Sequence, residues 1–331
     1  MLGKQPARRV AVFGAALALV GVSAAIGGQP AAEAAADTSA VVTICAVPPQ
    51  ATEHELTVRV TRRVADRLLR ETPSYPGRCA AYGTAGPLGL RTYATVDTGR
   101  TEAVGYVFPA TLLDSLPTTM SDRKHCFDVN GDGATDEHAE CSVGHEYPLD
   151  LPSVPGVPLT WALANYMPHG HAPEGVYTSP HLDLHFYLQP KAERDAIRPG
   201  PCGLLVNCED FARGMIPLPA ANMPKDYLDV GIVEVAMGNH LIDPSTPEWH
   251  GQPFSQSFMY GVYDGKVSFL EPMISLDLLR QLKAGLAASG CTPVKQPQSW
   301  QTPGSYPTTV CVRYRANRDD FTVSMEGFRA S

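Results

Sequence analysis

The amino-acid sequence predicts a mainly β protein, a barrel or a sandwich of sheets with a few peripheral helices, stabilised by disulfides. Three observations support this prediction: short runs of alternating polar and apolar residues, many turn residues (30 Pro and 29 Gly), and eight cysteines. With 331 residues, 44% of them hydrophobic, the chain is long enough to bury a core. Its net charge of −8 argues against a nucleic-acid-binding protein, which needs clustered Lys and Arg.

The N-terminus has the features of an export signal. Lys4, Arg8 and Arg9 precede the apolar residues 10–26, and three alanines follow at 34–36. This pattern predicts a signal peptide over residues 1–36 and a secreted, extracellular protein; Sec and twin-arginine export both stay open. The alternative is an uncleaved anchor, but 17 residues are short for a bilayer that needs about 20. No later segment is apolar enough to span, and the mature chain, with 23 basic and 33 acidic residues, carries −10.

All eight cysteines follow the predicted signal, and the chain has no Cys-x-x-Cys pair. An even number of cysteines in an exported protein is typical of disulfides rather than of thiolate metal ligands. Eight cysteines allow 105 pairings. We favour the sequential pairing because it closes four local loops: Cys45–Cys79, Cys126–Cys141, Cys202–Cys208 and Cys291–Cys311.

Composition and periodicity divide the mature chain into four parts. These are an N-terminal α+β part (37–121), a Cys-bracketed insertion (122–145), a His-rich β core (146–290) and a disulfide-closed tail (291–331). In the first part, Leu56, Val60, Val64 and Leu68 recur at intervals of four, which predicts a helix over residues 55–70. Residues 91–107 have the pattern of extended chain, and a short turn follows at 109–116.

The later elements follow from turn and cap signals. A short helix is predicted over residues 191–197. Asp264-Gly265 lies between two apolar runs, which predicts a β-hairpin, because a type I′ turn needs positive φ at both central residues. Ser275 is a candidate N-cap for a helix that continues to residue 286. The tail adds strand patterns at residues 309–315 and 321–326.

The Cys-bracketed insertion contains an acidic loop with the spacing of a calcium site. Calcium takes six to eight oxygen ligands on a tightly turned loop, and Gly133 is in the turn position of an EF-hand. Counted from Asp128, position 12 departs from the EF-hand pattern, because Ala139 stands where an EF-hand has a bidentate acid. Glu137 or Glu140 would have to substitute for that acid. The alternative is a surface loop that binds nothing. The predicted calcium ligands are Asp128, Asn130, Asp132, Asp136 and the carbonyl of Ala134.

Histidines cluster in the β core. His181, Asp183 and His185 alternate with apolar residues and share one face of a strand. On a regular strand His181 and His185 are about 13 Å apart, too far to bind one ion together. Such a site would therefore combine neighbouring pairs from adjacent strands, around zinc, iron or manganese. The predicted metal ligands are His169, His171, His181, Asp183, His185 and His240, with Glu174, Glu234 and Glu271 as further donors.

A metal is one of two interpretations of this strand face. The other is a hydrogen-bonded polar network in which a carboxylate orients each histidine. Nucleophilic catalysis has less support, because the sequence has no Gly-x-Ser-x-Gly elbow and its cysteines are assigned to disulfides. A Gly-rich phosphate loop and a His-Glu-x-x-His helix are also absent from the sequence.

The run from Trp161 to Tyr187, with its His-Gly-His-x-Pro-Glu-Gly-Val-Tyr and Pro-His-x-Asp-x-His-Phe-Tyr motifs, resembles a family of exported bacterial proteins of unknown function. The blocks at residues 238–243, 260–265 and 269–273 resemble the same family, so the similarity covers about residues 90–285. It implies a β-rich fold, export and a homo-oligomer, but no activity, ligand or catalytic residue. A looser similarity is to cupins, whose metal motif has the order of His169, His171, Glu174 and His240.

The sequence therefore predicts a secreted, β-rich protein that binds a divalent metal through its His/Asp strand face, without turnover. The alternative is a cupin-like, metal-dependent oxygenase or hydrolase, with Glu174 or Glu271 as the general base. Convergence of the ligands on one point beside a cavity would favour the enzyme. No reaction, substrate or small-molecule ligand follows from the sequence.

Overall fold

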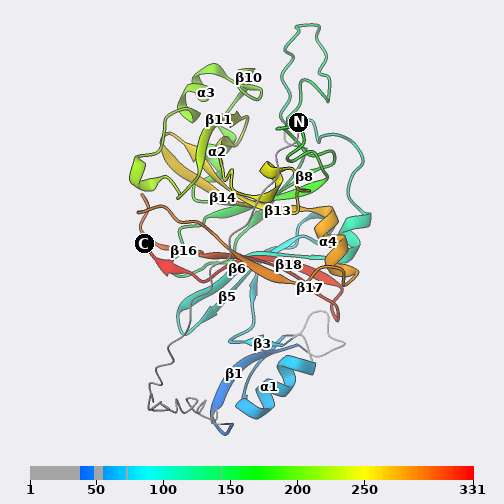
Figure 1. Ribbon diagram of the computed structural model, residues 1–331, viewed down its shortest axis with the longest axis vertical. Helices are drawn as coiled ribbons and strands as arrows, with labels where there is room; N and C mark the ends of the chain where they lie inside the picture. The colour runs from blue at the N-terminus through cyan, green and yellow to red at the C-terminus, as the bar shows by residue number, and fades with distance from the viewer. Residues whose placement is uncertain (1–37, 48–54, 72–73, 143) are drawn as a thin grey trace, which may run out of the picture. The chain divides into compact units, whose positions relative to one another are not determined.

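Two antiparallel sheets packed face to face form the centre of the computed structural model (Figure 1). The structure describes residues 38–47, 55–71, 74–142 and 144–331, so the predicted signal peptide lies outside the described residues. Residues 39–331 form one compact unit. The predicted mainly β fold is confirmed, and the arrangement is a sandwich.

The seven-stranded sheet has the order β11-β12-β13-β14-β9-β8-β7, and the six-stranded sheet has the order β15-β17-β18-β6-β5-β4. Strands from the predicted N-terminal part and from the predicted tail thus share one sheet. The strands of the first sheet are β7 (His145–Asp150), β8 (Trp161–Met167), β9 (His181–Tyr187), β11 (Leu228–Glu234), β12 (Gly238–Ile242), β13 (Gln256–Tyr263) and β14 (Lys266–Ser275). Those of the second are β4 (Ala81–Tyr82), β5 (Arg91–Asp97), β6 (Arg100–Pro109), β15 (Gly290–Pro293), β17 (Thr309–Arg315) and β18 (Asp320–Glu326).

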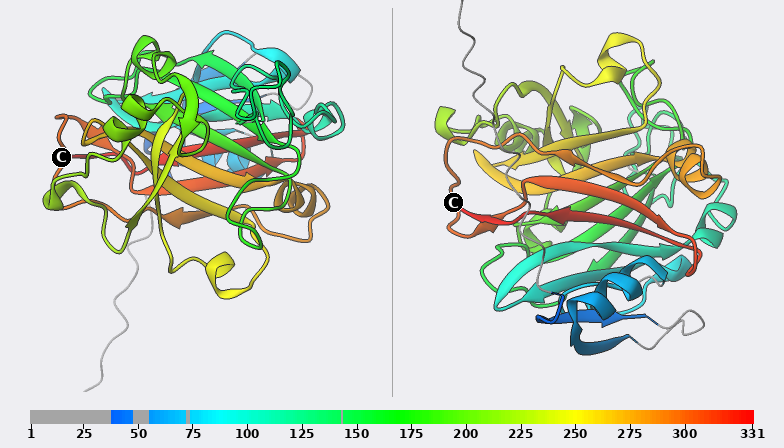
Figure 2. Two further views of the ribbon diagram at one scale, coloured as in Figure 1. Left: turned by 90° about the horizontal axis from the view of Figure 1, so that it is seen from above. Right: turned by 60° about the horizontal axis from the view of Figure 1, so that its bottom comes forward.

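Smaller elements cover the two outer faces (Figure 2). A three-stranded sheet of β1 (Val41–Ala46), β2 (Leu56–Thr61) and β3 (Tyr75–Pro76), with α1 (Arg62–Glu71), lies beside the six-stranded sheet. The remaining elements are α2 (Lys191–Asp195), β10 (Pro199–Cys202), α3 (Cys208–Gly214), α4 (Leu276–Lys283), the pair β16 (Ser305–Tyr306) and β19 (Arg329–Ala330), and the short 3-10 helices η1 (Pro87–Gly89), η2 (Ala110–Asp114), η3 (Ala220–Asn222) and η4 (Pro247–His250). None of the described helices is long and apolar enough to span a bilayer.

Some of the elements predicted from local sequence signals are confirmed, and one is partly wrong. The Asp264-Gly265 hairpin is confirmed as β13–β14, and both turn residues have positive φ. Ser275 does cap a helix by accepting the Leu278 N–H, although α4 ends at Lys283. The predicted helix over residues 55–70 is wrong in its first half, which is strand β2 paired with β1. The cysteines pair in sequential order as Cys45–Cys79, Cys126–Cys141, Cys202–Cys208 and Cys291–Cys311.

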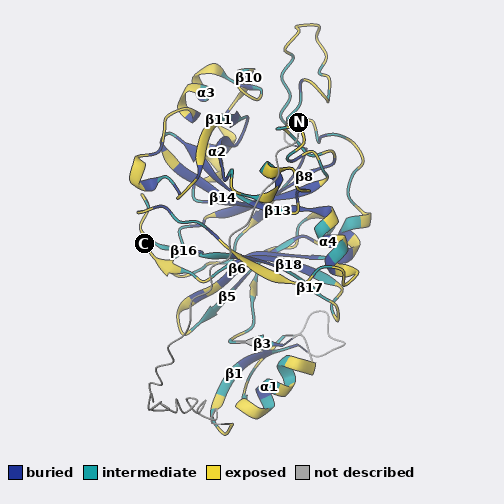
Figure 3. Cartoon of the chain, viewed as in Figure 1, coloured by how far each residue is buried: buried dark blue, intermediate teal, exposed yellow. Residues whose placement is uncertain are grey.

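The main apolar core lies between the two sheets (Figure 3). Strand β9 contributes Leu182, Leu184 and Phe186 to it, and β6 contributes Tyr106. The Tyr106 hydroxyl donates to the carbonyl of His185 at 2.7 Å, which ties the two sheets together. Each fully buried Leu or Phe stabilises the fold by about 1.5–3 kcal/mol, so this core carries most of the stability.

A buried ion pair attaches the covering elements to the outer face of the seven-stranded sheet. Glu146 of β7 contacts Arg194 of α2, and both side chains are about 5% exposed or less. Arg194 contacts Oε1 of the Glu146 carboxylate most closely. Nε2 of His125, in the Cys-bracketed insertion, lies 3.0 Å from Oε2 of the same carboxylate. One acid therefore holds two segments that are far apart in the sequence.

We expect Glu146→Gln to lower the free energy of unfolding by about 3 kcal/mol, because the buried Arg194 guanidinium loses its charged partner. Asp195→Asn is the matched control. Asp195 also contacts Arg194 but is 42% exposed, so the change should stay below about 1 kcal/mol. Urea denaturation at neutral pH measures both, and equal effects of the two variants would contradict the prediction.

The same pair predicts a pH dependence. Burial raises the pKa of Glu146, but the hydrogen bond from His125 and the charge of Arg194 outweigh it and lower the pKa from 4.5 to about 2. The stability that the ionised carboxylate supplies is therefore present above pH 4.5 and is lost as the pH falls towards 2. The stability difference between wild type and Glu146→Gln should shrink over that interval. An unchanged difference would show that the carboxylate charge is not its source.

Candidate metal centre

The outer face of the seven-stranded sheet carries the histidines. Side chains alternate along β9, so the residues that alternate with Leu182, Leu184 and Phe186 point to the opposite face. That face is buried as well: His181, Asp183 and His185 are at most 3% exposed. The segment that connects β8 to β9 and the strands β11 and β12 contribute further side chains beside it.

One set of ligand atoms, which we call the Asp183 group, comprises His171, His181 and Asp183. His181 Nε2 lies 3.0 Å from Asp183 Oδ1, and His171 Nε2 lies 3.7 Å from Asp183 Oδ2. Strand β9 supplies two of these residues, and the loop before it supplies His171. Gly170 allows this loop its turn, since its φ is +69° and a Cβ there would lie 2.0 Å from the carbonyl oxygen of Tyr177.

A second set, the Glu271 group, comprises His185, His240 and Glu271 from three strands of the sheet. His185 Nε2 lies 3.4 Å from Glu271 Oε1, and His240 Nε2 lies 3.9 Å from Glu271 Oε2. Gly261, paired with His240 across β12 and β13, leaves room for the ring of Phe269. That ring packs against both imidazoles, with centroids 4.8 and 5.2 Å away.

The histidine rings are oriented by backbone carbonyls. Nδ1 of His181 lies 2.6 Å from the carbonyl of Ser179, that of His171 lies 2.7 Å from the carbonyl of Ala172, and that of His240 lies 3.2 Å from the carbonyl of Ile232. A carbonyl only accepts hydrogen bonds, so in each ring Nδ1 carries the proton. In a neutral imidazole this leaves the Nε2 lone pair facing a carboxylate, and metal-binding histidines are oriented in this way.

Several of these atoms are buried without a hydrogen bond from the described residues. They are His181 Nε2, Asp183 Oδ1, both ring nitrogens of His185, and Glu271 Oε2. A buried polar atom that lacks a partner costs about 1–3 kcal/mol. These five atoms lie within the two groups, where a shared proton, a water molecule or a bound cation would satisfy them.

Burial shifts the ionisation of the Glu271 group towards neutral forms. It lowers the pKa of His185 to about 3 and lowers that of His240. It also raises the pKa of Glu271, and the nearby charges of Asp183 and Glu234 add to the increase. Near neutral pH both histidines are uncharged, so their nitrogens can coordinate a cation.

In the Asp183 group the pKa shifts of His171 and Asp183 favour the charged forms. Burial lowers the pKa of His171, but the hydrogen bond and charge of Asp183 outweigh it and raise the pKa to about 9. Burial raises the pKa of Asp183, whereas the charges and hydrogen bonds of His181 and His171 bring it below its usual range. The carboxylate is therefore ionised and supplies the negative charge that a divalent ion needs.

Both groups line one small cavity of about 50 Å³. His171 and Asp183 reach it from one group, and His240 and Glu271 reach it from the other. Glu234 of β11 adds a third carboxylate to its wall. This volume holds one or two water molecules, whose share of liquid water is about 30 Å³ each.

The structure brings together only some of the candidate ligands. His171, His181, Asp183, His185, His240 and Glu271 lie in the two groups, while His169 and Glu174 are exposed and belong to neither. The cupin-like order therefore does not assemble as a set. Sequence reasoning did not identify the carbonyls of Ala172, Ser179 and Ile232, because every residue type supplies a carbonyl.

The acidic loop in the insertion is folded around its own backbone. Asp128 accepts the N–H groups of Gly131 and Gly133, and Asn130 accepts that of Asp132. Glu140 accepts three backbone N–H groups, and Glu137 pairs with Arg123. Both candidate substitutes for the twelfth ligand are thus engaged elsewhere.

No protein-family model, curated protein or solved structure matches this chain.

Proposed function

We propose that this is a secreted protein that binds divalent transition-metal ions in the Asp183 and Glu271 groups. The proposal rests on one observation: buried imidazole nitrogens face buried carboxylate oxygens at 3.0–3.9 Å, while carbonyls hold the opposite ring nitrogen of three of the four histidines. Each contact between a nitrogen lone pair and a carboxylate oxygen becomes favourable when a proton or a metal ion lies between the two atoms. A metal ion satisfies both partners at once.

The donor set indicates the class of metal. Two imidazoles and a carboxylate suit zinc, iron or manganese, and each group supplies this set. Soft thiolate ligands are not offered, because all eight cysteines form disulfides. Two sets of ligands predict up to two ions per chain, with water from the shared cavity completing their coordination.

The size of the cavity favours binding over turnover. About 50 Å³ accommodates water at the metal but no organic substrate, which needs a pocket of about 300 Å³ or more. We therefore prefer a binding or structural role to the cupin-like enzyme.

Secretion is supported by the predicted signal peptide and by four disulfides, which persist in oxidising compartments. The homo-oligomer and the relation to exported bacterial proteins stay predictions.

Metal analysis tests the proposal. Elemental analysis after loading with zinc and desalting should give up to two ions per wild-type chain. His181→Ala and His185→Ala should each remove the ion of their own group and weaken its binding by roughly 100-fold or more. His169→Ala is the matched control, since this exposed histidine of the same motif should leave the metal content unchanged.

Manganese and iron(II) are loaded in parallel. If none of the three metals binds above the level of a non-specific control protein, the two groups are polar networks. If all three variants lose metal equally, binding lies elsewhere or is adventitious.

We further propose that calcium occupies the loop from Asp128 to Asp136 and has a structural role there. Support comes from the spacing of its oxygens and from the Cys126–Cys141 disulfide, which closes the loop. The engagement of Glu140 by backbone N–H groups implies a weak site, of the kind that millimolar extracellular calcium fills.

Thermal unfolding with and without calcium tests this site. At a dissociation constant of about 1 mM, about 10 mM calcium should stabilise the fold by about 1.4 kcal/mol. Asp132→Asn should abolish the increase, because the amide keeps an acceptor for the Ala134 N–H but removes the charge. An unchanged melting midpoint in wild type, together with no heat of binding, would show that the loop binds no calcium.

A further inference from the structure

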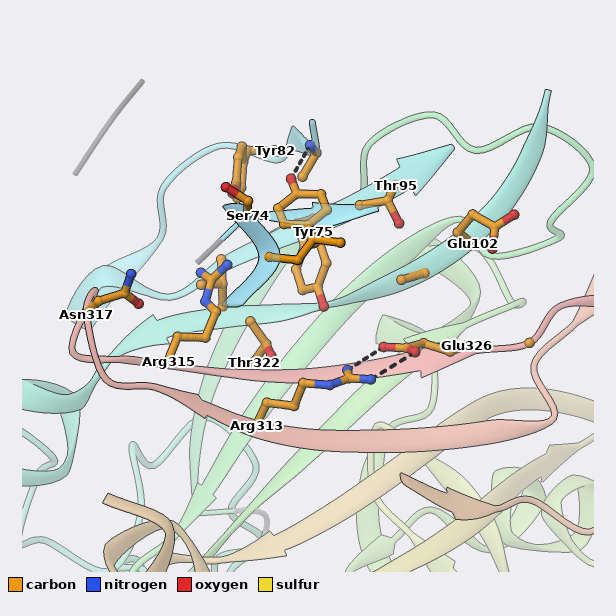
Figure 4. A pocket seen from close by; sticks show the side chains of 16 residues that line it. Ser74, Tyr75, Tyr82, Thr95, Glu102, Arg313, Arg315, Asn317, Thr322 and Glu326 are labelled. Atoms are coloured by element: carbon orange, nitrogen blue, oxygen red, sulfur yellow. Dashed lines mark hydrogen bonds and ion pairs between the residues drawn. The ribbon is translucent and has the colours of Figure 1, made fainter. Parts of the chain in front are cut away.

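A second, larger cavity lies on the opposite outer face of the sandwich. It has a volume of about 620 Å³, which is within the usual range for small-molecule sites. The six-stranded sheet forms one side, and the segment that carries α1 and β3 forms the other (Figure 4). The ligands of the metal groups lie on the other sheet, so this cavity is independent of the proposed function.

Tyrosines form one wall of the cavity, and a buried carboxylate holds two of them. Tyr75 and Tyr82 donate their hydroxyls to Glu55 at 3.0 and 2.6 Å. Arg318 donates to the same carboxylate at 2.9 Å, and its side chain and that of Glu55 are at most 10% exposed. Burial and Glu55 raise the pKa of Tyr82 to about 12, so its hydroxyl stays a donor. The rings are thereby oriented in advance.

Strands β17 and β18 of the six-stranded sheet form the polar side of the cavity, and the two arginines of β17 there are paired with acids; Figure 4 shows one of these pairs. Arg313 of β17 forms two hydrogen bonds to Glu326 of β18, at 2.5 and 3.1 Å. Arg315 pairs in the same way with Asp320, with both hydrogen bonds at 2.7 Å. Such pairs leave no net charge for a ligand to neutralise, while their outer atoms still donate and accept hydrogen bonds.

Neutral hydrogen-bonding groups complete the lining. Thr95 and Thr322 contribute hydroxyls, and Asn317 contributes an exposed amide. Ala103 also lines the cavity, and its side chain is small. The acid Glu102 is exposed, where water and salt screen its charge.

We propose that this cavity binds a neutral saccharide. A sugar ring has an apolar C–H face, which fits the tyrosine wall, and an edge of hydroxyls, which fits groups that both donate and accept. The paired charges disfavour a phosphate or an ammonium ligand, because either would have to compete with an ion partner already in place. A flat aromatic ligand would contact the tyrosines but would leave the threonine hydroxyls and the asparagine amide of the cavity without hydrogen-bond partners.

Calorimetry with four neutral trisaccharides tests the site: maltotriose, cellotriose, xylotriose and triacetylchitotriose. We expect at least one to bind the wild-type protein with a dissociation constant below about 1 mM. Thr95→Trp fills the cavity from β5 and should weaken that binding at least tenfold. Thr61→Trp, at an exposed threonine of β2 outside the cavity, should leave it unchanged.

Hydrogen exchange of the wild-type protein locates the bound sugar without a variant, so the test stands even if Thr95→Trp does not fold. Protection is expected in β3 and β17–β18. No binding of any trisaccharide at about 10 mM would overturn the proposal. Protection elsewhere, or equal affinity of the two tryptophan variants for the sugar, would also overturn it. The same holds if 4-nitrophenol, a flat aromatic probe, binds the protein and none of the trisaccharides does.

Discussion

Strand β9 is buried on both faces, and the rest of the structure depends on how that burial is satisfied. One face places Leu182, Leu184 and Phe186 in the core between the sheets, where each adds hydrophobic stabilisation. The other face holds His181, Asp183 and His185, for which burial is costly unless every polar atom has a partner. A second layer must therefore cover this face and supply those partners.

The covering layer satisfies only part of this demand. Backbone carbonyls accept the Nδ1 protons of three histidines, but the Nε2 atoms and two carboxylate oxygens turn towards one another. A solvated network would bring water to these atoms, yet the shared cavity has room for only one or two molecules. Burial lowers the pKa of His185 and raises that of Glu271, which favours the neutral form of both groups, so a bound cation would take the place of the Glu271 proton. A divalent metal ion would contact several of these nitrogen and oxygen atoms at once, which is why the two groups are candidate metal sites.

The sequence predicts the fold where the determining signal is local. Asp264-Gly265 predicts its hairpin because the turn conformation excludes most other residues, and the alternation in β9 sorts its side chains between two faces. Residues 55–70 show the limit. Leu56 and Val60 fit a helical spacing of four, but with Val58 they fit a strand equally well, and pairing with β1 decides in favour of the strand.

The candidate site is predictable only in its residue types. The pairing of His240 with Glu271 depends on the register of three strands, and the approach of His171 to Asp183 depends on the path of a loop. Neither is encoded in spacing along the chain.

Three of the four disulfides lie in segments that cover the sandwich, whereas Cys291–Cys311 joins β15 to β17 within the six-stranded sheet. Cys202–Cys208 lies in the segment that joins β10 to α3, and Cys45–Cys79 lies in the segment that walls the large cavity. Cys126–Cys141 closes the insertion that Glu146 holds through His125. A cross-link stabilises such a covering segment by restricting the unfolded chain. In this protein the hydrophobic core holds the sheets together, while disulfides and buried ion pairs hold the layers that form its two candidate sites.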